Sequence, residues 1–188
     1  DEVQTGQDGI MILKLEGSKQ IHIAENTCLV ISGLQWGEES EIANFNLKSG
    51  NVISVINEEL GTHERYEVET PELIMAVRGT IVSVDCEFKT GYSKAVFFDG
   101  QGMINSKLNA DTIEVLMGES AETDNGRIKR TDVEQLSLNN AERRFLFDDT
   151  YRSLLDDQDA EIISSRLEAI LSKQAFIEEI RQTAAVYI

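Results

Sequence analysis

The chain has 188 residues, 41% of them apolar, and a formal net charge of −17. A chain this acidic is a poor ligand for nucleic acid or anionic lipid, because both would repel it. Its apolar residues are patterned, which excludes a disordered acidic chain, and no apolar run approaches the roughly 18 residues of a membrane span.

Residues 1–131 consist of short apolar runs separated by turn signals. The runs lie at 10–15 (IMILKL), 21–23 (IHI), 27–31 (TCLVI), 45–47 (FNL) and 52–56 (VISVI). This spacing favours an all-β sandwich, barrel or solenoid over alternating β and α units. We therefore expect a mainly β domain over residues 1–131, either β-solenoid-like or a jelly roll or sandwich. Compact turns are expected at Glu16-Gly17-Ser18, Asp99-Gly100 and Asn125-Gly126, the last of which suits a type I′ hairpin.

The character of the sequence changes after Asp132, because glycine is absent from the remaining residues. Asn140 is a possible N-cap for a helix over residues 141–156, and residues 159–182 carry an amphipathic helical stripe. We expect residues 132–188 to form a C-terminal helical segment that packs on the β domain or on a partner. Its possible partner surface consists of Ile163, Leu167 and Ile170.

The sequence shows no pattern typical of a catalytic or metal site. His22 and His63 are the two histidines, and neither has a cysteine or a second histidine at metal-ligand spacing. His22 lies on the opposite face of an alternating strand from its apolar neighbours, so we expect it to point at solvent. The acidic stretch 156–159 can attract a hard cation, but it also suits the capped start of a helix. We therefore expect no catalytic residue, no metal and no cofactor.

Three side chains leave alternatives open. Trp36 is the single tryptophan, and its ring can stack on a sugar, mark a partner surface or lie partly buried in a turn. Cys28 and Cys86 are either two buried free thiols or one disulfide.

The segment from Tyr66 to Asp85 combines strand sequence with two interruptions. Pro71 cannot donate to a strand ladder, so it should end the strand over 66–69 and fix a corner. Arg78 then interrupts an apolar run, and we expect it to clip two layers together by pairing with a carboxylate. Gly79 allows the chain to bend there.

Two short motifs in this segment resemble the signature of FecR-type domains. The motifs are Val68-Glu69-Thr70-Pro71 and Val77-Arg78-Gly79-Thr80. Other stretches agree with the family in order: Val3-Gln4-Thr5-Gly6, Phe45 to Val52 and Ala95 to Gly100. The resemblance covers roughly residues 1–130. In this interpretation Thr70, Pro71, Val77, Arg78, Gly79 and Thr80 are structural and hold the fold.

The resemblance implies a non-enzymatic, extracytoplasmic sensing or binding domain of a bacterial envelope protein, with cell-surface signalling as one expected role. The best-known members of the family sense an outer-membrane transporter and signal to a sigma factor through an inner-membrane helix. The partner implied is another envelope protein or a glycan, and the alternative is a carbohydrate- or cell-wall-binding or structural module. We expect a location in the periplasm or at the cell surface, with an anchor removed from this chain. Residues 132–188 do not resemble the βαβ module that follows this domain in the iron-transport regulators. This difference counts against the transmembrane-signalling role of those regulators for this chain.

Overall fold

The computed structural model describes residues 1–16, 19–37, 40–57, 59–124, 126–131, 138–155, 158–169 and 172, without the side chains of Arg78, Asp124 and Arg152. The chain divides into two compact units, residues 1–142 and 143–188. The division falls inside helix α1 (Asn140–Phe147). A domain boundary between residues 131 and 132 stays a prediction, since residues 132–137 lie outside the described ranges.

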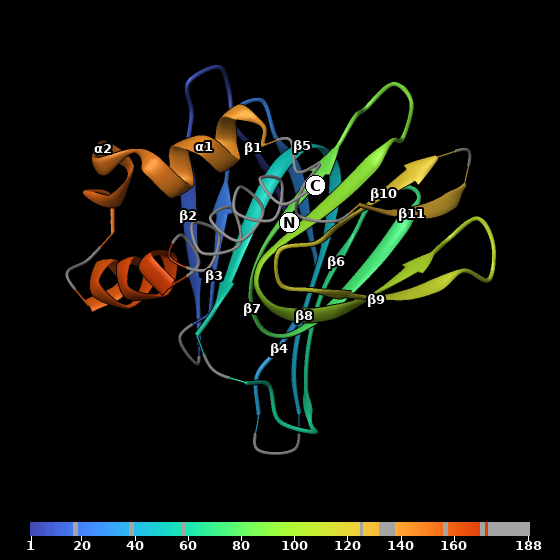
Figure 1. The fold of residues 1–188 in the computed structure, drawn as a ribbon, viewed down its shortest axis with the longest axis horizontal. Helices are drawn as coiled ribbons and strands as arrows, with labels where there is room; N and C mark the ends of the chain where they lie inside the picture. The colour runs from blue at the N-terminus through green and yellow to red at the C-terminus, as the bar shows by residue number, and fades with distance from the viewer. Residues whose placement is uncertain are drawn as a thin grey trace, which may run out of the picture. The chain divides into compact units, whose positions relative to one another are not determined.

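The first unit is built from β-strands that belong to one branched sheet (Figure 1). In chain order the described strands are β1 (Glu2–Gln4), β2 (Met11–Leu15), β3 (Lys19–Ile23), β4 (Cys28–Gln35), β5 (Glu41–Ile56), β6 (Glu64–Glu69), β7 (Leu73–Cys86), β8 (Ser93–Ser106), β9 (Thr112–Leu116), β10 (Ser120–Asp124) and β11 (Arg127–Thr131). All pairs are antiparallel except β5 with β6, which is parallel.

Three long strands, β5, β7 and β8, pass from one layer of this sheet to the other. The first layer contains β1, β4, the start of β5, β6, the start of β7, the end of β8 and β9. The second contains β2, β3, the end of β5, the end of β7, the start of β8, β10 and β11. The sheet therefore folds back on itself around one core.

A glycine with positive φ marks the place where each long strand changes layer. The φ values are 89° at Gly50, 58° at Gly79 and 74° at Gly100. A Cβ on Gly50 would lie 2.3 Å from Thr27 Oγ1, and one on Gly100 would lie 2.5 Å from the Gly79 carbonyl oxygen. Glycine is needed here because the backbone is left-handed and closely approached.

The predicted turn at Asp99-Gly100 is therefore wrong, because both residues lie inside β8. The predicted hairpin at Asn125-Gly126 is confirmed, since β10 and β11 pair up to Asp124 and Arg127 around it. In both places glycine supplies a positive φ, and only the pairing of the flanking residues separates a kink within a strand from a turn between strands.

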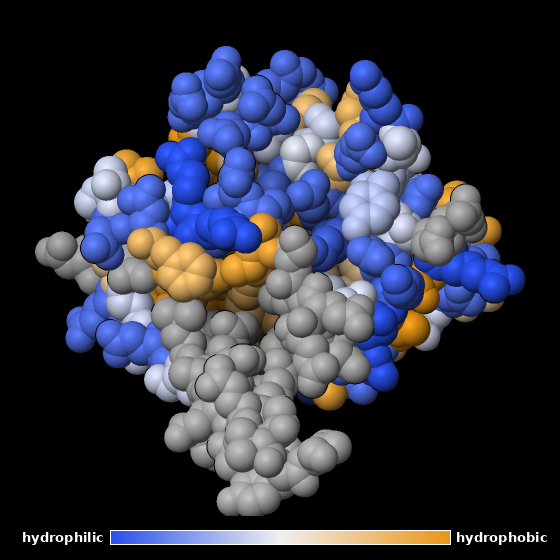
Figure 2. Space-filling view, turned by 45° about the horizontal axis from the view of Figure 1, so that its top comes forward, coloured by the Kyte–Doolittle hydropathy of each residue, from blue (hydrophilic) through white to orange (hydrophobic). Residues whose placement is uncertain are grey.

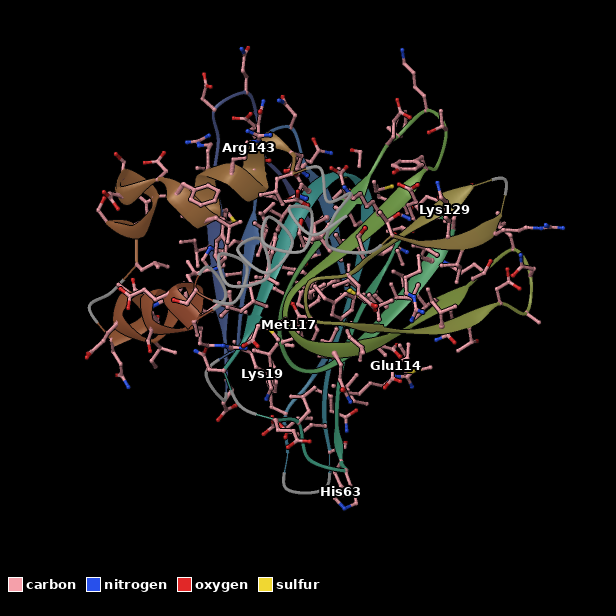
Figure 3. The ribbon with its side chains drawn as sticks, viewed as in Figure 1. Lys19, His63, Glu114, Met117, Lys129 and Arg143 are labelled. Carbon is pink, nitrogen blue, oxygen red and sulfur yellow. The ribbon has the colours of Figure 1, made fainter. Side chains whose placement is uncertain are left out.

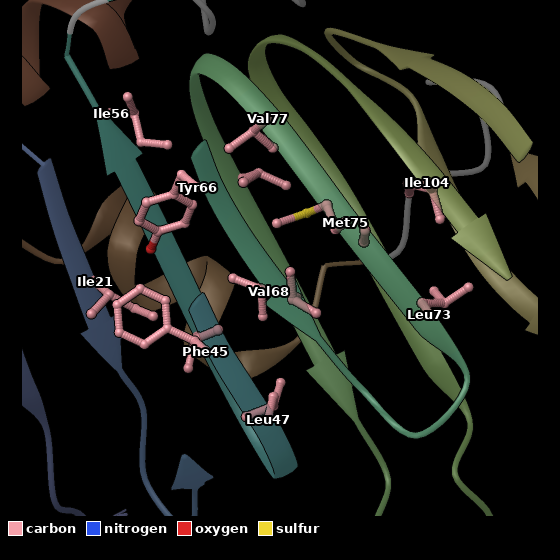
Figure 4. Close-up of a cluster of buried hydrophobic side chains, with 14 of the residues drawn as sticks. Ile21, Phe45, Leu47, Ile56, Tyr66, Val68, Leu73, Met75, Val77 and Ile104 are labelled. Atoms are coloured by element: carbon pink, nitrogen blue, oxygen red, sulfur yellow. The ribbon is translucent and has the colours of Figure 1, made fainter. Parts of the chain in front are cut away.

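The hydrophobic core lies between the two layers (Figure 4). Phe45 and Tyr66 pack as tilted rings with centroids 5.5 Å apart, and Met75, Val82 and Phe97 are also fully buried there. The prediction of a mainly β domain with a C-terminal helical segment is confirmed. Of the predicted alternatives, the structure is a sandwich that closes toward a barrel and not a solenoid, because its two mostly antiparallel layers share strands.

The outer face of the second layer is also buried, which corrects the prediction for His22. His22 does lie on the opposite face from Ile21 and Ile23, but it is only 1% exposed and does not point at solvent. Its face also carries Ile53 and Val55, which are buried as well. The alternation in the strand was interpreted correctly, but the second face of this layer is not solvated.

Helix α1 starts with a reciprocal cap. The Glu142 N–H donates to Asn139 Oδ1, and the Asn139 N–H donates to Glu142 Oε2, both at 2.8 Å. Asn139 Nδ2 also donates to Asp85 Oδ2 at 2.8 Å, which ties the cap to β7. This is a capping box, so the cap is Asn139 and not the predicted Asn140.

The second unit contains two further helical stretches, α2 (Asp149–Arg152) and residues 158–169. The single helix predicted over 141–156 is wrong, because Asp148 separates α1 from α2 and accepts the Thr150 N–H as the α2 N-cap. The helix predicted over 159–182 is present in the part of that range that the structure describes, residues 159–169 and 172. Among the described residues, no helix combines the length and the apolar composition needed to span a lipid bilayer.

Candidate functional site

The Thr-Pro motif forms the corner between β6 and β7, as predicted. Thr70 is fully buried and its Oγ1 accepts the Leu73 N–H at 3.0 Å and the Ser93 hydroxyl at 2.7 Å. The Thr70 N–H donates to the Leu73 carbonyl at 2.9 Å. Pro71 occupies the turn, where no ladder bond is needed. The motif therefore joins two strands of the first layer to β8.

The second motif lies where β7 leaves the first layer. Val77 packs in the core, and Gly79 provides the bend. Thr80 is fully buried, and its Oγ1 has no hydrogen-bond partner among the described residues. The backbone of Arg78 pairs with Gln101. Its side chain lies outside the description, so its role as a clip stays a prediction.

A cluster of four side chains closes one end of the sandwich, and we call Lys19, Trp36, Glu41 and Glu64 the Lys19 cluster. Lys19 Nζ lies 2.8 Å from Glu41 Oε2 and 2.7 Å from Glu64 Oε1, and 5.9 Å from the centre of the Trp36 ring. Lys19 belongs to the second layer, whereas its carboxylate partners begin β5 and β6 in the first. Figure 3 shows Lys19 in the lower half of the ribbon, above the turn that carries His63.

The charges of the Lys19 cluster stabilise one another. Burial by itself would lower the pKa of Lys19, but hydrogen bonds to Glu41 and Glu64 hold it above its ordinary value. The hydrogen bond from Lys19, followed by that from the Gly61 N–H, lowers the pKa of Glu64. Lys19 is 5% exposed, whereas the two carboxylates are about a third exposed at 32% and 28%. The cluster thus presents negative charge to solvent above a buried cation.

Trp36 and Leu34 add exposed apolar surface at the end of the sandwich where the Lys19 cluster lies. Their exposed fractions are 36% and 43%. The described residues of the neighbouring connections, 36–37, 40–41, 57 and 59–64, include Glu41, Glu59 and Glu64 and neither lysine nor arginine. An exposed aromatic ring with carboxylates around it suits contact with a basic protein surface.

A groove of about 220 Å³ opens beside the Lys19 cluster, where β6 and β7 diverge. Pairing between these strands stops at Glu67 and Ala76. The groove is lined by Glu64, Arg65, Tyr66, Ala76, Val77, Gln101, Gly102, Met103 and Glu114. It arises because β7 turns toward the second layer at Gly79 while β6 stays in the first.

The predicted partner residues of the helical segment are not exposed in this structure. Ile163 and Leu167 are each 1% exposed. Ile170 lies outside the described residues. A partner could contact the first two only after a rearrangement, and their role in binding stays a prediction. The predicted partner residue Trp36, in contrast, is open to solvent.

The titratable side chains outside the Lys19 cluster do not gather into a reactive site in the described part of the chain. No group of three or more His, Cys, Asp or Glu side chains is placed to hold a metal ion there. Burial lowers the pKa of His22 to about 4 and raises that of Cys86 to about 11, so neither is charged near neutral pH. Cys28 and Cys86 are free thiols, as the first of the two alternatives held, but only Cys86 is buried and Cys28 is partly exposed.

The carboxylates and the lysine of the cluster were missed by sequence reasoning. Lys19, Glu41 and Glu64 come from three strands and are up to 45 residues apart in the chain. One signal was available, because Lys19 shares the alternating face of Ile21 and Ile23 and so had to point at the core side.

The coloured part of the face shown in Figure 2 is mostly hydrophilic, with hydrophobic residues in smaller patches. A charged surface of this kind is compatible with the net charge of −17.

Comparisons with known proteins agree with the motifs. The model of the family described as FecR protein matches residues 1–100. Two crystal structures of a candidate anti-sigma factor from Parabacteroides distasonis ATCC 8503 share the fold, each with a TM-score of 0.57, at 13% and 14% identity. In each case the alignment covers 70% of this chain but 59% of the other, so the chain spans about three fifths of that protein. No curated protein matches the sequence. Since the family model covers more than half of the residues and the signature motifs lie within it, the chain belongs to the FecR family.

Proposed function

We propose that the chain is a non-enzymatic sensing and binding domain that acts outside the cytoplasm, in the envelope of a bacterium, as part of cell-surface signalling. Membership of the FecR family is the observation that carries this proposal. The candidate anti-sigma factor with the same fold supports the signalling part of it. The partner is another envelope protein, and an anchor outside this chain holds the domain at the membrane.

The Lys19 cluster with Leu34 is the surface that we assign to the partner. It combines an exposed aromatic ring, a second exposed apolar side chain and carboxylates held in place by a buried lysine. Rigid aromatic side chains bury a large area at a low entropic cost, which is why they are common binding anchors. The ion pairs of Lys19 hold Glu41 and Glu64, the first residues of β5 and β6, near the Trp36 ring.

A cell-wall or carbohydrate-binding module is the competing function, and the exposed Trp36 ring is the observation that favours it. Aromatic rings can stack on sugars as well as contact proteins. In the described part of the chain, however, the charged groups placed at the ring are Lys19, 5.9 Å from its centre, and the carboxylates of Glu41 and Glu64 that Lys19 holds. This arrangement supports a protein partner over a neutral glycan.

The test replaces Trp36 with Ala in the producing cell and compares transcripts with those of the wild type. Phe88→Ala is the matched control, because it also removes one aromatic ring, 77% exposed, from a turn. Signalling predicts a discrete group of genes whose expression changes in Trp36→Ala only, at equal protein level. Unchanged transcripts together with loss of the chain from the cell-wall fraction would instead support the carbohydrate-binding module.

A further inference from the structure

Strand β11 is an edge of the second layer. Among the described residues it pairs with β10 and with no other strand. An edge strand presents backbone N–H and C=O groups that can pair with another chain. β9 is the edge of the first layer on the same side of the unit, and the two strands lie near each other without pairing (Figure 1).

The register of the hairpin shows which backbone groups β11 offers. Asp124 and Arg127 close a two-residue loop, so they form a hydrogen-bonded pair. Such pairs alternate along an antiparallel ladder, and Arg127, Lys129 and Thr131 direct their backbone groups at β10. Ile128 and Arg130 therefore direct theirs to the free side. These two residues supply two donors and two acceptors for an added strand.

The side chains of β11 are basic in a strongly acidic protein. Arg127, Lys129 and Arg130 lie within four positions and are all exposed. Lys129 is 3.8 Å from Glu122 and Arg130 is 3.8 Å from Glu119, with the two cations 62% and 52% exposed. Ion pairs this long and this exposed contribute little to stability, so carboxylates of a partner can easily replace Glu122 and Glu119. Ile128 instead packs against the core.

We propose that the β11 edge binds an extended segment of a partner protein in which acidic and apolar residues alternate. The segment adds as a strand along Ile128 and Arg130. Its acidic side chains lie on the outer face beside Arg127 and Lys129, and its apolar side chains lie on the inner face beside Ile128. The proposal rests on the proposed partner-binding function and names one element that the partner contributes.

A second role for such charges is to keep other strands away, since lysine and arginine on an edge oppose uncontrolled pairing. This role and the proposed one differ in one respect. A purely protective edge repels or ignores every extended peptide, whereas the proposed edge selects acidic ones. The charge of the peptide therefore decides between them.

The experiment titrates the full chain, labelled with ¹⁵N, with the peptide acetyl-Glu-Val-Glu-Val-Glu-Val-amide at low salt. The control peptide replaces each Glu with Lys. We expect chemical-shift changes and slower hydrogen exchange at the amides of Ile128 and Arg130 with the acidic peptide only. An acidic peptide methylated on every backbone nitrogen should fail, because it has no backbone N–H group to donate to the edge.

Charge reversal supplies the variant test. Arg127→Glu with Lys129→Glu should weaken binding of the acidic peptide about tenfold at low salt, the size expected for two exposed ion pairs. Lys89→Glu is the control, since it changes the charge of an exposed turn residue. Binding that is equal for both peptides, or unchanged in the double variant, would overturn the proposal.

The same double variant separates this inference from the proposed function. If Trp36→Ala changes transcription but Arg127→Glu with Lys129→Glu does not, the signalling function stands and the β11 site falls. If neither variant changes transcription, the signalling function falls, and peptide binding alone decides the β11 site.

Discussion

Tyr66 Oη donates a hydrogen bond of 2.8 Å to Ser54 Oγ across the core. Tyr66 belongs to β6 in the first layer, and Ser54 belongs to the part of β5 that lies in the second. Both side chains are at most 1% exposed, so the bond joins the two layers in the buried interior. A buried polar pair of this kind fixes the relative position of the layers, because each group costs free energy if it loses the other.

Tyr66→Phe should lower the free energy of unfolding by about 1–2 kcal/mol, because it leaves the buried Ser54 hydroxyl without this partner. Urea denaturation measures the change. Tyr92→Phe is the control, since the Tyr92 hydroxyl bonds Glu122 at a more exposed position. An equal effect of the two substitutions would contradict the special role of the core bond.

Lys19→Met should lower the free energy of unfolding at pH 7 by about 1–2 kcal/mol, a value discounted for the partial exposure of Glu41 and Glu64. Lys19 lowers the pKa of Glu64 in the folded state, so the stability from this pair is present at neutral pH and lost as pH falls through the acid range. The penalty should therefore shrink near pH 3.5. Denaturation of both proteins at the two pH values checks this, and a constant penalty would show that packing, not charge, is lost. Lys107→Met, which breaks a more exposed pair with Glu69, is the control.

The stability of the protein should fall between pH 6.5 and about 4, the interval over which His22 is neutral when folded and protonated when unfolded. Burial, followed by the charge of Lys14, lowers the pKa of His22, and a shift of this size corresponds to about 3 kcal/mol. His22→Gln should flatten the profile over this interval. His63→Gln, at an exposed turn position, should leave it unchanged. A wild-type slope that survives His22→Gln would mean that another group causes it.

Glu142→Gln should gain stability relative to the wild type as pH rises through the raised pKa of Glu142. Burial raises the pKa of Glu142, and nearby Asp85 adds to the rise. A raised folded-state pKa gives stability that is present at low pH and lost as pH rises through it. Glutamine has no such loss and still accepts the Asn139 N–H of the capping box. The comparison uses thermal unfolding across the pH range, with the exposed Glu114→Gln as control. A difference that shrinks with pH would refute the sign.

Gly50→Ala should lower the free energy of unfolding by more than about 2 kcal/mol, because it combines positive φ with a contact of 2.3 Å to Thr27. Gly6→Ala is the matched control, since nothing lies within 4 Å of its added Cβ. It should change stability by about 0.5 kcal/mol at most. Similar effects at both glycines would contradict the need for glycine at Gly50, where positive φ and the close approach of Thr27 are expected to exclude a side chain.

Much of the β domain could be predicted because its signals are local. Pro71 ends a strand wherever it occurs, and the Asn125-Gly126 pair suits a hairpin with any partner. The motifs around Thr70 and Gly79 were enough to indicate the family. The face on which His22 lies followed from the period of two along a strand.

Only the tertiary structure decided what those local features meant. Gly100 supplies a positive φ whether it makes a turn or a kink, and the pairing of β8 with strands of both layers made it a kink. The position of His22 was fixed by its strand, but its burial depends on what covers that face. The Lys19 cluster joins residues from three strands, and no period in the sequence brings them together. The sequence thus determined the strands and the family, whereas contacts between distant segments decided burial, pKa values and the candidate site.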